Sequence, residues 1–341
     1  MLTTTDRVLD NLNGALHTLL AEDPRLFLLG EDVADPYGGA FKVTAGLSTK
    51  YPGRVLSTPI SENGIVGVAN GLALTGNRAI VEMMFGDFAA LCFDQILNVS
   101  AKSVSMFGET LPVPVVVRVP TGANRGYGPT HSQSLQKHFV GIPDLDLYEL
   151  SPLHDTLDVL RRMLGSGRPG MFFENKTVYG QRMRAPGPID ELFGYEYADD
   201  ERHWARVTSA VDGGGCLLIV AGGMVSRALD AARTLLLEDE IDVTVAVASR
   251  LYPLDPEPIL DDVARARHVF VAEESTPGAT WGAEVAQRLA ETCWDRLSGP
   301  VGLIGSRDRV IPAARHLERR VVVQTEDIVT RVRERMVACA P

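Results

Sequence analysis

Two ionisable side chains stand in sequence contexts where they could do acid-base chemistry. Glu62 lies in STPISENGIVGVANGLALTG, just before a helix in which Gly67 and Gly71 allow close packing. A carboxylate there either stabilises the helix dipole or serves as a catalytic acid, and the pattern alone favours the helix-start interpretation. His131 lies in NRGYGPTHSQS, a glycine-rich polar loop that follows the strand-like run VPVVVRVP. Because imidazole titrates near neutrality it can shuttle protons, but the pattern alone gives catalysis only even odds.

Two aromatic residues lie at the end of another strand-like run. Phe85 and Phe88 lie in EMMFGDF, and core packing is the favoured interpretation of both. The sequence contains no GxSxG, no Walker loop and no GxGxxG between a strand and a helix. These absences weigh against a serine hydrolase, a kinase and a free-standing nicotinamide dehydrogenase.

The elements that must position these residues alternate between strands and helices in the first half of the chain. Helix-length amphipathic segments are expected at 64–75, 93–104 and 155–165. The strand-like runs that alternate with these helices are RLFLLG, RAIVEMMF, VPVVVRVP and GMFFENK. This alternation predicts an α/β fold with a parallel sheet covered by helices, and loops at the end of such a sheet carry functional side chains.

The pattern breaks between Arg182 and Arg206, where proline, glycine and charged residues are concentrated. We therefore predict a first domain over residues 1–185, a linker without a regular core over 186–205, and a second domain over 206–341. In the second domain the strand-like runs CLLIVAGG, DVTVAVASRL and HVFVAEES alternate with expected helices at 226–237 and 256–266. The second domain is thus predicted to be a smaller α/β unit.

Composition excludes several classes of function. A content of 45% hydrophobic and 23% charged residues is that of an ordinary globular protein. The net charge of −11 argues against a nucleic-acid partner and against binding to anionic lipid, since both require a basic surface. No apolar run reaches the roughly 20 residues that span a bilayer, and the opening segment has the pattern of an amphipathic helix. A cytoplasmic protein without membrane association is expected.

Six blocks, taken in order, resemble one family: the beta subunit of the thiamine-diphosphate-dependent decarboxylating component of 2-oxo acid dehydrogenases, of the pyruvate and branched-chain type. The blocks are GEDVADPYGGAFKVTAGL, STPISENGIVGVANGLAL, FGDFAALCFDQILNVSAK, PVVVRVPTGANRGYGPTHSQS, LYPLDPEPIL and VFVAEESTPGATWGAEVAQRLAE. They cover nearly the whole chain. The resemblance implies a transketolase-like pyrimidine-binding domain followed by a transketolase C-terminal domain.

The resemblance also implies roles for individual residues. Glu62 corresponds to the glutamate that hydrogen-bonds the aminopyrimidine of thiamine diphosphate, which favours the tautomer that acts as an internal base. Phe88 falls where an aromatic ring packs against the pyrimidine, and His131 matches the histidine that faces the reacting carbon. Glu31 and Met84, in the first block and before the third, complete the expected cofactor-binding set. The resemblance thus overturns the favoured pattern-based interpretations of Glu62 and Phe88.

One part of the family's cofactor site has no counterpart here. The diphosphate and magnesium site of the family uses a GDG sequence followed by paired asparagines, and this sequence lacks that combination. We therefore expect this chain to bind only the pyrimidine end of thiamine diphosphate and to carry no metal ligand. Magnesium is expected on a separate alpha subunit, in an α2β2 heterotetramer with the cofactor at each interface.

Three departures from the family's pattern lie near the expected catalytic loop. Ser57 stands where the family often has Asp, residues 135–137 read Leu-Gln-Lys where an acidic residue often follows, and Asp144 replaces a turn glycine. They leave open which 2-oxo acid is the substrate and which acceptor takes the acyl group. The leading hypothesis is oxidative decarboxylation with acyl transfer to the lipoyl group of a partner acyltransferase. A carboligase that joins the carbanion to a carbonyl compound is the alternative, and a non-catalytic scaffold is disfavoured because Glu62, Phe88 and His131 are all present.

Overall fold

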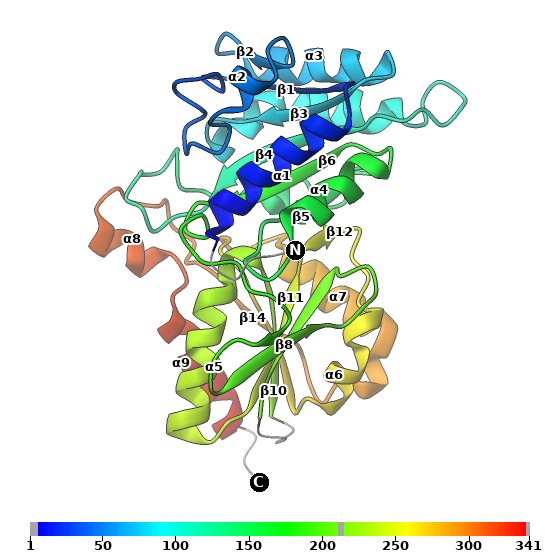
Figure 1. Ribbon diagram of the computed structural model, residues 1–341. Helices are drawn as coiled ribbons and strands as arrows, with labels where there is room; N and C mark the ends of the chain where they lie inside the picture. Colours follow the sequence, from blue (N-terminus) through cyan, green and yellow to red (C-terminus); the bar gives the residue numbers. More distant parts are fainter. Residues whose placement is uncertain (1–5, 211–214, 339–341) are drawn as a thin grey trace.

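The computed structural model describes residues 6–210 and 215–338, which form two α/β units, each built on a seven-stranded sheet (Figure 1). The strand order of the first sheet is β12-β5-β6-β4-β3-β1-β2, and all neighbouring pairs are parallel except β12 with β5. Its strands are β1 (Leu26–Gly30), β2 (Val55–Ser57), β3 (Arg78–Glu82), β4 (Val115–Thr121), β5 (Asp146–Glu149), β6 (Gly170–Asn175) and β12 (Arg250–Tyr252). The predicted parallel sheet is confirmed, and β12 joins it from the other half of the chain.

Helices cover both faces of the first sheet. The helices α1 (Val8–Glu22) and α4 (Thr156–Gly165) pack together over one face, because each places its apolar residues three or four positions apart. The other face is covered by α3 (Glu62–Leu74), the 3-10 helix η1 (Gly86–Cys92) and the π-helix η2 (Gln95–Ala101). The short helix α2 (Leu47–Lys50) precedes β2.

The helix expected over 93–104 is present, but its middle is not α-helical. Residues 93–94 and 102–103 are α-helical, and between them lies the π-helix η2, in which hydrogen bonds span five residues instead of four. The Ser100 hydroxyl lies 3.0 Å from the carbonyl oxygen of Gln95 and 2.7 Å from Oδ1 of Asn70 on α3. These hydrogen bonds tie η2 to α3, and residue spacing alone does not reveal them.

The second sheet has the order β14-β13-β10-β11-β9-β8-β7, with four parallel strands extended by three antiparallel ones. Its strands are β7 (Gly187–Pro188), β8 (Phe193–Tyr197), β9 (Trp204–Ser209), β10 (Cys216–Ala221), β11 (Val243–Ala248), β13 (His268–Ala272) and β14 (Gly302–Ile304). In Figure 1, α5 (Val225–Asp239) and α9 (Thr325–Ala338) lie on one side of this sheet, and α6 (Leu260–Arg265) and α7 (Trp281–Cys293) on the other. Helix α8 (Arg315–Val321) lies apart, beside the first unit.

The segment 186–205, which we expected to be a linker without a regular core, contains β7, β8 and the start of β9. Asp190 makes the turn: its Oδ1 accepts hydrogen bonds from the backbone N–H groups of Leu192 and Phe193, 2.9 and 3.0 Å away. Phe193 and Tyr195 then alternate into the core of the second unit. A strand pattern of only five residues was obscured by the surrounding proline, glycine and charge.

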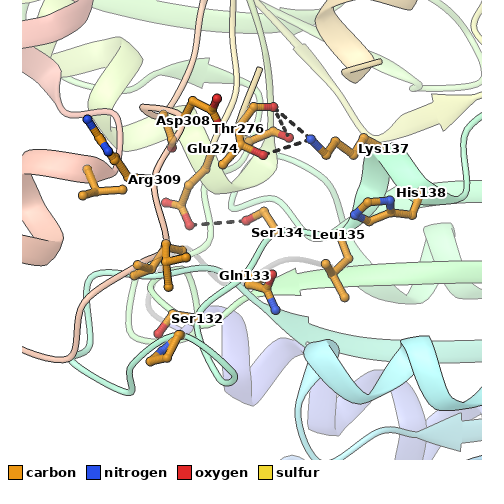
Figure 2. Close-up of a pocket in the computed structure, with 16 residues that line it drawn as sticks. Ser132, Gln133, Ser134, Leu135, Lys137, His138, Glu274, Thr276, Asp308 and Arg309 are labelled. Atoms are coloured by element: carbon orange, nitrogen blue, oxygen red, sulfur yellow. Dashed lines mark hydrogen bonds between the residues drawn. The ribbon is translucent and has the colours of Figure 1, made fainter. Parts of the chain in front are cut away.

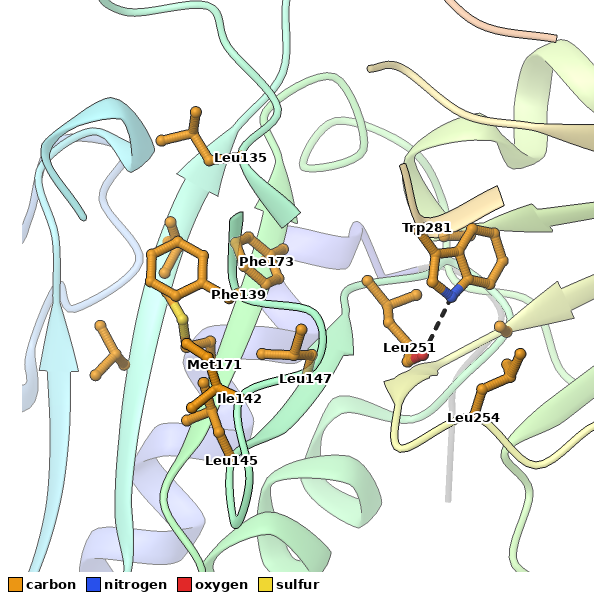
Figure 3. Packing of buried hydrophobic residues seen from close by; sticks show 14 of the residues in the cluster. Leu135, Phe139, Ile142, Leu145, Leu147, Met171, Phe173, Leu251, Leu254 and Trp281 are labelled. Carbon is orange, nitrogen blue, oxygen red and sulfur yellow. Dashed lines mark hydrogen bonds between the residues drawn. The ribbon is translucent and has the colours of Figure 1, made fainter. Parts of the chain in front are cut away.

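The two units share a hydrophobic core at their junction. Figure 3 shows Phe139, Phe173 and Leu147 of the first unit beside Leu251 and Trp281, all within one cluster of buried side chains. The indole Nε1 of Trp281 donates to the carbonyl oxygen of Leu251, 3.1 Å away. The relative position of the units is therefore set by close apolar packing. Among the described helices, none combines the length and apolarity that a bilayer span requires.

Candidate active site

Three aromatic rings meet at the carboxyl ends of β3 and β4. The ring of His131 lies 4.6 Å from that of Phe85 and 5.3 Å from that of Phe88, in both cases edge to face. Tyr127 also contacts Phe85 edge to face, with ring centres 5.7 Å apart. Phe85 and Phe88 are half-buried. Phe85, for which core packing was expected, is thus a central member of the cluster, although its sequence context gave no sign of this.

A loop of left-handed turns carries His131 to these rings. After β4 ends at Thr121, the backbone has positive φ at Gly122, Asn124, Gly126 and Gly128, with values of 89°, 68°, 75° and 80°. Glycine and asparagine are the residues that adopt this conformation at little cost. The local sequence therefore explains why the chain reverses here, and the reversal brings His131 back over the end of the sheet.

Polar contacts fix the ends of this loop. The side-chain amide of Gln133 donates to Oδ1 of Asp87 at 2.7 Å, which ties the loop to η1. The Nδ1 atom of His131 lies 3.0 Å from the hydroxyl of Thr130. When Nδ1 is engaged with Thr130, Nε2 is the ring nitrogen left for another partner. The histidine is therefore oriented in the loop.

Two buried carboxylates lie together at the start of α3. Glu62 is the first residue of α3 and Glu31 follows β1; each is only 6% exposed. Burial raises the pKa of Glu31, and the negative charges of Glu62 and Asp32 raise it further. Neither carboxylate forms an ion pair with any described residue, and Oε1 of Glu31 has no hydrogen-bond partner among them. Buried acids without a cation are costly unless a donor engages them, so this pair is suited to binding a hydrogen-bond donor.

Packing of α3 against η1 connects the carboxylates to the aromatic cluster. Cys92, at the end of η1, has its pKa raised to about 12 by burial, with a smaller contribution from Glu62. Within the described parts of the chain, no hydrogen bond, ion pair or ring contact joins Glu62 directly to Phe88 or His131. Met84 is half-buried between β3 and η1. The cofactor roles of these residues stay predictions.

A buried lysine lies beneath the aromatic cluster. Lys176, just after β6, is fully buried, and its Nζ lies 5.7 Å from the centre of the Phe85 ring. Burial lowers its pKa to about 8, although Asp87 and Glu274 act in the opposite direction. A buried basic group therefore lies next to the Phe85 ring of the aromatic cluster. Sequence reasoning missed it because lysine in a strand-end pattern normally indicates an exposed position.

A cavity of about 470 Å³ opens between the loop after His131 and the second unit (Figure 2). Ser134 donates to Oε1 of Glu274 at 3.3 Å, and Nζ of Lys137 donates to the hydroxyl and carbonyl oxygens of Thr276 at 2.9 and 3.1 Å. Lys137, one of the residues that depart from the family's pattern, therefore joins the two units at the cavity wall. The other two departures lie elsewhere: Ser57 accepts a hydrogen bond from the N–H of Ala34, and Asp144 occupies a turn position with φ of 59°.

Comparison with known proteins identifies the parts of the chain. Residues 8–181 match the transketolase pyrimidine-binding domain, and residues 206–328 match the transketolase C-terminal domain. Over 94% of its length the chain is 34% identical to the mitochondrial pyruvate dehydrogenase E1 component subunit beta-2 of Oryza sativa, covering 84% of that protein. It is 32% identical to the beta subunit of acetoin:2,6-dichlorophenolindophenol oxidoreductase of Cupriavidus necator, covering 95% of this chain and 96% of the relative.

A solved structure shares the fold at low sequence identity. It is a split-gene transketolase, described as an inactive beta4 tetramer, which superposes with a TM-score of 0.71 at 20% identity and covers 97% of this chain and 98% of that one. At this identity the likeness establishes the two-domain transketolase-like fold alone.

Proposed function

Because the chain belongs to the family of pyruvate-dehydrogenase-type beta subunits, with transketolase pyrimidine-binding and C-terminal domains, we propose that it is the beta half of a thiamine-diphosphate-dependent enzyme that oxidises 2-oxo acids. The observation that carries the proposal is the contact between His131 and Phe88, two residues that the resemblance assigns to substrate and cofactor. They come from separate segments and meet beside the helix that begins with Glu62.

The buried carboxylates fit the pyrimidine end of the cofactor. Glu31 has a buried oxygen without a partner among the described residues, and Glu62 begins a helix on the same face. In this proposal Glu62 holds the proton shared with a ring nitrogen of the aminopyrimidine, and Phe88 orients the ring by stacking. Met84 contributes an apolar, adaptable contact. When bound, thiamine diphosphate supplies the electron sink that decarboxylation requires.

His131 acts on the substrate in this proposal. Its Nδ1 is engaged with Thr130, so Nε2 is the atom that hydrogen-bonds the 2-oxo acid and moves a proton during decarboxylation or acyl transfer. The edge-to-face contacts with Phe85 and Phe88 restrict the imidazole to one orientation. Lys176 lies below these rings, where its charge favours an anionic substrate above the rings.

The other half of the active site is proposed to come from an alpha subunit. Large apolar side chains are exposed just before α3, on α3 and on η1, which packs against α3: Ile60 is 84% exposed, Val68 55% and Leu91 61%. Such a patch beside a buried carboxylate is typical of a protein interface. We propose that the alpha subunit covers it in an α2β2 heterotetramer and supplies the diphosphate and magnesium site, and that the acyl group passes to a lipoyl acyltransferase. A cytoplasmic location is part of this proposal.

A second candidate is a carboligase that forms an acyloin instead of passing the acyl group to a lipoyl protein. The relatives from Cupriavidus necator and Bacillus subtilis, each 32% identical, are named as oxidoreductases that act on acetoin, an acyloin. In these relatives the acyloin is the substrate and not the product, so the names support only that a related site accepts an acyloin. The two candidates use the same residues of this chain and differ in the acceptor. Lys137 and Ser134 line the cavity beside the loop that carries His131.

Calorimetric titration of thiamine diphosphate and magnesium tests the proposal. The chain is titrated alone and as a complex with an alpha-type subunit encoded beside it, with Glu62→Ala in the complex as control. We expect tight binding only to the complex, and loss of 2-oxo acid decarboxylation in the variant. Tight binding to the chain alone would contradict the split site. Product analysis with a lipoylated domain or with an aldehyde as acceptor then separates the two candidates.

A further inference from the structure

The loop that carries His131 presents its backbone N–H groups to the second unit. The left-handed residues Gly122, Asn124 and Gly126 alternate with Ala123 and Arg125. Alternation of this kind turns successive N–H groups toward one side and forms a concave site for an anion. The loop therefore needs an anionic partner on that side.

Two buried glutamates of the second unit occupy this position. Oε1 of Glu274 accepts a hydrogen bond from the N–H of Ala123 at 2.6 Å. The two carboxylate oxygens of Glu318 accept from the N–H groups of Asn124 and Gly126, at 2.9 and 3.0 Å. Glu274 also pairs with Arg227 at 2.7 Å. Glu318 forms no close ion pair with any residue in the described ranges, so its hydrogen-bond partners are the loop amides, and the charge of Lys176 adds a weaker attraction.

Glu318 is also unusual for its place in α8. It is 1% exposed and is the one buried residue of that helix, which spans Arg315–Val321. A surface helix normally packs through a stripe of apolar residues, because burial of apolar surface stabilises the contact. Helix α8 instead faces the molecule with a carboxylate. Apolar packing therefore does not explain the residue at this position, and the hydrogen bonds to the loop do.

From these contacts we infer that Glu318 is a positioning residue, which holds the loop of residues 122–134 so that His131 lies against Phe85 and Phe88. The inference rests on the proposed function, because it assigns the geometry of His131 to the reaction. Glu318 does not touch the rings itself. It acts through the backbone between Asn124 and Gly128, where the hydrogen bond from the N–H of His131 to the carbonyl oxygen of Gly128 begins the next turn.

The test compares Glu318→Gln with Glu326→Gln, an exposed glutamate of α9, each in the complex with the alpha subunit. The glutamine has the shape of the glutamate, but its amide group can accept from only one of the two N–H groups. We expect kcat/KM for the 2-oxo acid to fall about 10- to 100-fold in Glu318→Gln, because small misplacements of catalytic groups have effects of that size. Binding of thiamine diphosphate, which depends on Glu62, should match that of Glu326→Gln.

Hydrogen-deuterium exchange provides a readout that does not depend on activity. Peptides from 122–134 should exchange faster in Glu318→Gln than in Glu326→Gln, and peptides from β4 should be unchanged. Equal exchange in the two variants would overturn the inference, whatever their activity. If the complex acts on no 2-oxo acid, the proposed function fails, while the exchange data still decide the role of Glu318.

Exchange in the unsubstituted complex covers the case in which Glu318→Gln does not fold. The amides of Asn124 and Gly126 should be protected although they lie in a loop, in contrast to those of the exposed segment 107–110. Protection supports the hydrogen bonds to Glu318, and exchange as fast as in 107–110 overturns them.

Discussion

Two regions of the first unit differ in whether their buried ionisable side chains have partners of opposite charge. The first region lies on the neighbouring strands β3, β4 and β6. There Arg118 donates two hydrogen bonds to Glu174, at 2.7 and 2.9 Å, and one to Glu82 at 2.5 Å. Tyr179 also donates to Glu174, at 2.6 Å. At the start of α3, Glu31 and Glu62 are also buried, each 6% exposed, but have no cation among the described residues.

The pKa shifts follow from this difference. Burial opposes the charged form of Arg118, but the attraction of Glu174 and Glu82 outweighs it, and the pKa of Arg118 is raised. Burial raises the pKa of Glu31, and its acidic neighbours add to the shift because no cation offsets it. In the first region both carboxylates are paired with Arg118, so we interpret its role as structural. The second lacks a partner, which is the condition expected of a binding site.

The largest expected effect is on stability, from breaking the complete network. Arg118→Met should lower the free energy of unfolding by about 3–5 kcal/mol, because two carboxylates would stay buried without their cation. Urea denaturation of the purified chain measures the loss. Arg331→Met is the control, since the pair of Arg331 with Glu334 is exposed and contributes less than about 1 kcal/mol. Equal losses in the two variants would show that the network is not structural.

The next effect is on catalysis, from neutralising the incomplete region. Glu62→Gln should lower the activity of the complex by about 100-fold or more, because an amide cannot share a proton with the cofactor. Its free energy of unfolding should not fall, since the substitution breaks no ion pair with a described residue. Glu109→Gln, in an exposed loop, is the control for both measurements. A variant that unfolds as readily as Arg118→Met would place Glu62 among the structural charges.

A smaller effect is expected from the ring beside the incomplete region. Phe88→Leu should weaken binding of thiamine diphosphate to the complex by up to about tenfold, which corresponds to the roughly 1 kcal/mol of an aromatic contact. Phe93→Leu is a matched control, because Phe93 packs on Phe139 with ring centres 5.4 Å apart and does not contact His131. Titration calorimetry measures both. Identical affinities would mean that Phe88 serves only the core.

The smallest effect is a change in the pH dependence of stability. Because the pKa of Glu31 is raised above its ordinary value of 4.5, the folded chain keeps a proton that the unfolded chain has already lost. Stability from this group is therefore present at low pH and is lost as pH rises from 4.5 through the folded pKa, by at most about 1.4 kcal/mol per pH unit. The slope should disappear in Glu31→Gln and persist in Glu109→Gln. Thermal unfolding of the chain alone at several pH values measures it.

The sequence by itself determined the elements that depend on local pattern. The apolar runs of the parallel strands and the spacing of apolar residues in α1 and α4 predicted both the elements and the fold class, because period and burial are encoded within each segment. The ordered motifs predicted the family and selected Glu62, Phe88 and His131 as site residues. The same approach missed β8, whose pattern is short, and it predicted the helix over 93–104 without the π-helix η2 inside it.

Only the tertiary structure decided which distant residues meet. Glu318 and Asn124 are far apart in the sequence, and no local pattern links a carboxylate in α8 to amide groups of the His131 loop. Likewise Lys176 is buried, and β12 pairs with β5, because the second unit folds back against the first over a shared core. Hydrogen bonds and burial of this kind depend on chain positions that are remote in sequence. The residue types of the site can therefore be predicted from the sequence, whereas the contacts that orient them require the assembled fold.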